Sequence, residues 1–179
     1  MPRAEPNREA LLALLEESYD RPAWHGPNLR GSVRGLSAQE AAWRPAAGRH
    51  SIWELVLHCA YWEHAVARRL GMGGKRGSFP RTPSNFPRQP EVTGRAWREE
   101  LRLLDETHRR LLEAAEAALR RRARSAAERA REARLVRGIA SHNIYHAGQI
   151  RLLIRLSGAK ARSRGRQEGA TPPKPADRA

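Results

Sequence analysis

An apolar repeat near the end of the chain predicts a helix with one inward face. Its members recur at alternating steps of four and three residues, so their side chains share one face. They are Leu135, Ile139, His142, His146, Gln149, Leu153 and Leu156. Two imidazoles one turn apart thus occupy positions that a helical bundle usually gives to Leu or Ile. Burying these rings costs free energy unless each ring finds a polar partner.

The composition predicts an all-α protein. Its 179 residues suffice for one domain with a substantial core. Ala, Leu, Arg and Glu dominate, and β-branched runs are nearly absent. The single cysteine, Cys59, excludes an internal disulfide and fits a reducing compartment. The chain shows no signal-like segment and no apolar run of membrane-spanning length, so we expect a cytoplasmic protein without a membrane partner.

Four long helical segments predict a four-helix bundle. They are expected over residues 7–19, 51–70, 93–122, and from 126 or 132 to 157. Ser51 and Glu54 form a capping box at the start of the second long helix, and Ser37 and Glu40 form another before a short turn. A connection rich in Gly, Pro and Ser separates the second and third long helices over residues 71–90.

The basic charge is concentrated in two regions. The net charge is +15; eight arginines against two glutamates give residues 120–137 an excess of +6, and six basic against two acidic residues give 159–179 an excess of +4. We expect a bundle domain over residues 1–158 and a disordered basic tail over 159–179. No known nucleic-acid-reading module accompanies the charge, so any nucleic-acid binding is expected to be non-specific.

Three histidines are candidate metal ligands. His142 and His146 form an HxxxH pair, and His58 borders the apolar stripe of the second long helix. We call these residues the histidine triad. Three neutral imidazoles can cap a divalent ion and leave one coordination position open, as reactive metal sites require. The spacing alone leaves a second interpretation open, in which the rings are hydrogen-bonded core residues.

Two sequence strings resemble the paired signatures of the DinB-like (YfiT/DinB) superfamily of metal-binding four-helix bundles. The strings are SIWELVLHCAYWE at residues 51–63 and HNIYHAGQI at residues 142–150. The similarity runs from the first helix to about residue 156 and includes residues 24–27 and 79–87. It implies that the histidine triad binds a divalent metal.

The resemblance also implies a chemistry. Members of known role include thiol S-transferases that use bacillithiol, mycothiol or glutathione, and a mycothiol-dependent isomerase. We therefore expect a metal-dependent transferase in which a metal-bound thiolate attacks a small electrophile. A hydrolase that activates water and a non-catalytic metal-binding stress-response protein are the alternatives. Three imidazoles suit nickel, zinc, iron and copper alike, so the metal is not specified. Relatives commonly dimerise, which is compatible with a homodimer.

Four further residues are candidates for the substrate site: His25, Trp62, Tyr145 and Gln149. His25 lies in an irregular stretch, where functional side chains are frequent. Gln149 follows His146 by one turn and is expected either to hydrogen-bond a water on the metal or to close the end of the bundle. For Trp62 and Tyr145 the alternative is simple packing between helices.

Other notable residues are interpreted without a site role. Cys59 is turned about 100° from His58 around the helix axis and is expected to be a small core residue. His50, His64 and His108 are interpreted as surface residues. Asn143 stands where relatives commonly carry an acid, so the tuning of the metal is expected to differ.

Overall fold

The computed structural model describes residues 7–72 and 78–158, and this part of the chain is all-helical. Its elements are α1 (Arg8–Tyr19), α2 (Leu29–Ser32), α3 (Ala38–Ala42), α4 (Ile52–Ala67), the π-helical turn η1 (Arg68–Met72), α5 (Gly94–Arg120) and α6 (Ala126–Leu156). The all-α prediction is confirmed. The predicted tail over 159–179 lies outside the described residues, as does part of the connection between α4 and α5.

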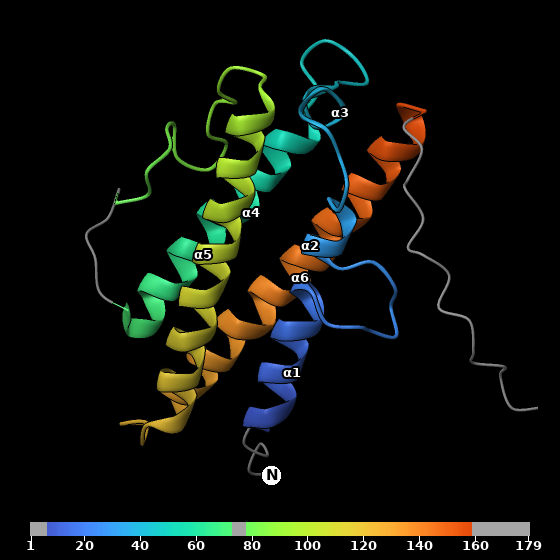
Figure 1. The fold of residues 1–179 in the computed structure, drawn as a ribbon. Helices are drawn as coiled ribbons and strands as arrows, with labels where there is room; N and C mark the ends of the chain where they lie inside the picture. Colours follow the sequence, from blue (N-terminus) through green and yellow to red (C-terminus); the bar gives the residue numbers. More distant parts are fainter. Residues whose placement is uncertain (1–6, 73–77, 159–179) are drawn as a thin grey trace, which may run out of the picture.

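The four long helices lie alongside one another (Figure 1). Helix α4 packs against both α5 and α6, and α1 packs against the same two helices. The short helices add to the sides of this assembly, α2 against α6 and α3 against α4. The arrangement is consistent with the predicted four-helix bundle, and it brings α4 and α6 side by side.

Side-chain caps explain where the long helices begin. Asn7, Thr93 and Ser125 each accept a hydrogen bond from a backbone N–H in the first turn that follows. Ser51 and Glu54 form the predicted capping box at the start of α4. Because Ser125 caps α6, this helix starts at Ala126, which is the earlier of the two predicted starts.

Helix α4 occupies the centre of the core. Most of its residues are buried, including Trp53, which is fully buried against Trp97 of α5. Cys59 is also fully buried, and burial raises the pKa of its thiol well above the ordinary value. A thiol held neutral inside the core is no nucleophile, in agreement with the core role predicted for it.

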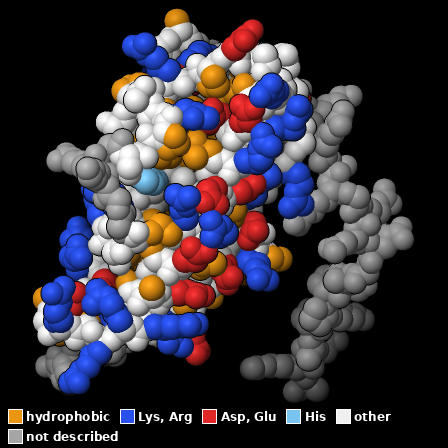
Figure 2. Space-filling view, turned by 60° about the vertical axis from the view of Figure 1, so that its left-hand side comes forward, with side chains coloured by type: hydrophobic (Ala, Val, Ile, Leu, Met, Phe, Trp, Pro, Cys, Tyr) orange, Lys and Arg blue, Asp and Glu red, His pale blue; other side chains and the backbone are white. Residues whose placement is uncertain are grey.

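The exposed faces carry mixed charge. Figure 2 shows basic and acidic side chains side by side on one face of the molecule. Many of them pair at helical spacing, as in Arg95 with Glu99 and Arg110 with Glu106. Within the described residues, no helix is both long and apolar enough to cross a membrane.

Candidate metal centre

The three imidazoles of the histidine triad meet between two helices. His58 lies on α4, and His142 and His146 lie one turn apart on α6. The Nε2 atom of His142 is 3.1 Å from Nε2 of His58 and 3.2 Å from Nε2 of His146. Ligand atoms from the three residues all lie within 4.8 Å of one another. The rings of His58 and His146 are buried, and His142 is partly exposed.

Hydrogen bonds on the far side of two rings direct their lone pairs toward this meeting point. The Nδ1–H of His58 donates to the backbone carbonyl of Asn85 at 2.6 Å, and the Nδ1–H of His146 donates to Oε1 of Gln149 at 2.7 Å. A neutral imidazole carries one proton, so both rings present an unprotonated Nε2 to the centre. Such orientation by a second hydrogen bond is typical of metal-binding histidine.

Burial keeps the rings neutral. It lowers the pKa of His58 to about 4 and that of His142 to about 3, and neighbouring imidazoles add to the shift. Burial also lowers the pKa of His146. Near neutral pH all three rings are therefore available as neutral ligands, which is the form that binds a metal.

The spacing of the nitrogens fits a divalent cation. Imidazole nitrogens bind zinc at about 2.0–2.1 Å, so two of them about 90–109° apart around one ion lie about 2.8–3.4 Å from each other. The separations of His142 Nε2 from the other two Nε2 atoms fall in this range, and ligand atoms of all three residues lie within 4.8 Å of one another. The single proton of a neutral His142 ring can satisfy at most part of this group of nitrogens, whereas a cation satisfies all of them at once. The triad can thus hold a divalent metal.

The connection before α5 completes the site. The sequence did not predict that Asn85 and Phe86 contact the triad. Asn85 has a φ of 75°, a left-handed conformation that Asn tolerates better than most residues. Its carbonyl oxygen accepts from His58, and its side-chain Oδ1 accepts from Nε1 of Trp62 at 2.8 Å. The next residue, Phe86, stacks on the His58 ring with 4.0 Å between centroids. The feature of the sequence that could have indicated this role is the similarity of residues 79–87 to the DinB-like superfamily.

The four predicted substrate-site residues are placed differently from one another. Gln149 binds Nδ1 of His146 and donates from Nε2 to the Tyr145 hydroxyl, so it orients a ligand ring rather than closing the bundle. Tyr145 is 63% exposed, so it is not packed between helices. Trp62 borders the triad beside His142. Both ring nitrogens of His25 are buried without a hydrogen-bond partner among the described residues, and no contact with the triad is seen there.

A buried polar cluster lies on the side of α6 next to the triad, and it corrects one prediction. Glu63 of α4 is fully buried, and its Oε1 accepts from Nδ1 of His108 at 3.0 Å and from Nδ2 of Asn143 at 2.8 Å. Thr107 donates more weakly to its other oxygen. The prediction that His108 is a surface residue is wrong, because the ring is buried and stacked on Tyr19. An acceptor on a neighbouring helix makes this burial favourable, and a single-helix pattern does not reveal it.

The same cluster changes the interpretation of Asn143. This residue is fully buried, and its amide turns toward Glu63 instead of the triad. The buried carboxylate here is contributed by α4, and the amide on α6 is its hydrogen-bond donor. Asn143 therefore ties the ligand-bearing turn of α6 to α4, next to His142.

Comparison with known protein families gives a match over most of the chain. The family model described as the DinB superfamily matches residues 3–150. Neither a curated protein nor a solved structure matches the chain.

Removal of the Glu63 carboxylate is expected to destabilise the fold strongly. Glu63→Ala leaves the buried donors of His108 and Asn143 without an acceptor, which costs about 1–3 kcal/mol for each donor. Glu113→Ala is the matched control, because this carboxylate pairs with Arg109 on the surface and is expected to contribute about 1 kcal/mol or less. Urea unfolding measures both, and similar losses in the two variants would contradict a supporting role for Glu63.

The metal-free protein should lose stability in mild acid. The folded state holds the pKa of His58 and His142 well below the 6.5 of an unperturbed ring, so below about pH 6.5 the unfolded chain binds protons that the folded chain does not. The free energy of unfolding is therefore expected to fall from about pH 6.5 down to about pH 4. Urea unfolding across this range, with a chelator present, should show a shallower fall in His142→Asn, and parallel curves would refute the explanation.

Proposed function

We propose that this chain, which belongs to the DinB superfamily of metal-binding proteins, is a divalent-metal-dependent enzyme that transfers a low-molecular-weight thiol to small electrophiles. One observation carries the proposal: the neutral Nε2 atoms of the triad converge while partners on the far side of two rings prevent them from turning away. A purely structural cluster of histidines has no need of unprotonated nitrogens that face each other.

The surroundings of the triad suit a reactive site better than a closed structural one. Three protein ligands leave a coordination position of a divalent ion for another molecule. His142 is partly exposed and lines an open groove, so a small molecule can reach this position from solvent. Bound there, a divalent cation would act as a Lewis acid that favours the ionised form of a thiol at neutral pH.

The protein residues have three tasks in this proposal. The triad would hold the cation with neutral rings, and Asn85 and Gln149 keep two of those rings in position. Phe86 stacks on the face of the His58 ring and shields that face from water, and Trp62 lies edge-on to the same ring. In the reaction the thiol loses its proton to solvent, its sulfur forms a bond to the electrophilic carbon, and the leaving group departs with its electron pair.

The first test concerns the metal. The full-length protein is expected to retain close to one equivalent of nickel, zinc or iron after dialysis, as measured by elemental analysis. His58→Ala, His142→Ala and His146→Ala should each lose most of it, because two imidazoles hold a divalent ion much more weakly than three. His64→Ala is the control, since this ring bonds Ser78 outside the triad. Circular dichroism checks folding, and full metal content in all three triad variants would remove the basis of the proposal.

The second test concerns the chemistry. The metal-loaded protein is mixed with an aryl halide and, in turn, with glutathione, bacillithiol and mycothiol, and thioether formation is followed by mass spectrometry. We expect turnover with at least one thiol and a fall of at least about 100-fold in His142→Ala, the range typical for loss of a group that stabilises developing charge. Product formed from water instead of the thiol would indicate a hydrolase. Absence of any product would favour a non-catalytic metal-binding protein.

A further inference from the structure

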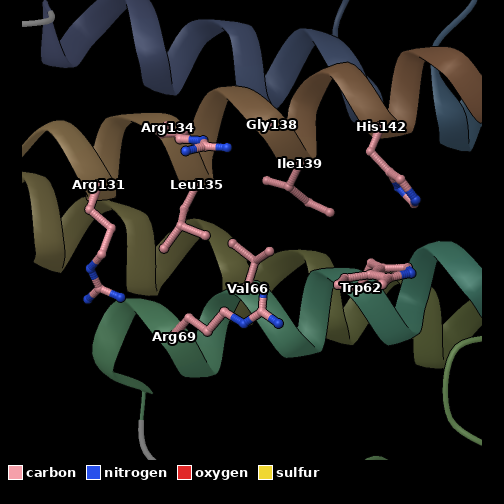
Figure 3. A pocket seen from close by; sticks show the side chains of 9 residues that line it. All are labelled: Trp62, Val66, Arg69, Arg131, Arg134, Leu135, Gly138, Ile139 and His142. Atoms are coloured by element: carbon pink, nitrogen blue, oxygen red, sulfur yellow. The ribbon is translucent and has the colours of Figure 1, made fainter.

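An open groove adjoins the triad between α6 and the C-terminal part of α4 with its extension η1 (Figure 3). Its volume is about 490 Å³, which is the size of a site for a small molecule. Trp62 and His142 lie at one end of the groove, and Arg131 lies at the other. The walls between them are apolar and include Val66 and Ile139. The groove thus leads from solvent to one of the triad nitrogens.

Three arginines line this groove without ion pairs. Arg69 comes from η1, and Arg131 and Arg134 come from α6. Among the described residues, no carboxylate lies within salt-bridge distance of any of the three. The guanidinium of Arg69 lies 5.7 Å from the centre of the Trp62 ring. This contact keeps the positive charge of Arg69 near the end of the groove that adjoins the triad.

Several arginines that precede the groove in the sequence, by contrast, do have acidic partners. Just before the groove, Arg121 and Arg129 both pair with the buried carboxylate of Glu132. Most exposed arginines of α5 also form an ion pair with a glutamate three or four residues away. Arg131 and Arg134 are exposed residues that line the groove, and no carboxylate of the described residues balances their charges there, so the groove attracts an anion.

Gly138 leaves space in the wall of the groove. It lies in the middle of α6, four residues before His142, where glycine costs about 1 kcal/mol relative to alanine. A Cβ atom at this position would meet no atom within 4 Å, so packing does not require glycine. The residue lines the groove, and the missing side chain keeps the path open between the arginines and the triad.

We infer that the groove binds a small-molecule substrate with an apolar body and a terminal carboxylate or phosphate, which Arg131 and Arg134 hold while the other end passes Arg69 and reaches the triad. This inference rests on the proposed function and names the class of substrate for it. Eight residues of helix separate Arg134 from His142, or about 12 Å, so the ligand is about as long as a substituted aromatic acid. The anionic group can belong to the electrophile or to the thiol.

The test uses phenyl phosphate as the probe and the full-length, metal-loaded protein. Isothermal titration calorimetry should detect binding that weakens with salt, and phenol, which lacks the charge, should bind at least about tenfold more weakly. Arg131→Gln and Arg134→Gln should each weaken binding about tenfold, since a hydrogen bond to a charged group contributes about that factor. Arg137→Gln is the matched control, because it removes the same charge from an exposed position of α6 outside the groove lining.

Two further variants separate the groove from general electrostatics and from the metal. Gly138→Leu keeps every charge but fills the groove, and it should abolish binding while the metal content stays unchanged. His58→Ala should lose metal and still bind phenyl phosphate within about threefold, so loss of the metal site and loss of the anion site are distinguishable. Competition by glutathione would assign the anionic group to the thiol, and lack of competition would assign it to the electrophile.

Three results would overturn the inference. The first is no binding of phenyl phosphate by the unaltered protein. The second is equal weakening in Arg137→Gln and Arg134→Gln, which would show attraction by net charge alone. The third is binding that disappears in His58→Ala and survives in Arg131→Gln and Arg134→Gln, which would mean that the probe binds the metal directly.

Discussion

The mutual approach of three neutral imidazoles is the constraint on which the site depends. Nitrogen lone pairs about 3 Å apart in a dry environment repel each other unless a cation or a proton lies between them. The low pKa of His58 and His142 keeps both rings neutral near neutral pH, so each ring carries a single proton. One N–H of His142 cannot satisfy both neighbouring nitrogens fully, whereas a divalent cation would satisfy all three and would link α4 to α6 directly.

The protein supports this contact from two sides. On one side, the connection before α5 supplies a carbonyl oxygen from Asn85 and an aromatic ring from Phe86 to His58. On another, Glu63 ties α4 to α5 through His108 and to α6 through Asn143. Asn143 directly follows a triad residue, so the cluster that stabilises the core also positions the ligand-bearing turn.

The arrangement also explains the uneven use of charge. Most arginines of α5 are balanced by glutamates on the same helix, which gives a solvated surface without directed function. The region over residues 120–137 is different, because part of its excess charge lines the groove beside the triad. A positive excess that in the sequence resembles a weak nucleic-acid signal partly lines, in three dimensions, the groove beside the triad.

Local patterns in the sequence were enough to predict the long helices and the residues that can bind a metal. Caps and apolar periodicity are local, so Ser51 with Glu54 predicted the start of α4, and the four-three repeat placed His142 and His146 on one face of α6. The contacts that those side chains make depend on how the helices pack. The partners of His58 and Glu63 lie on other elements, far along the chain, and no local spacing encodes such contacts. For that reason His108 was misjudged as exposed, Asn85 was overlooked, and the arginines of the groove were counted only as charge.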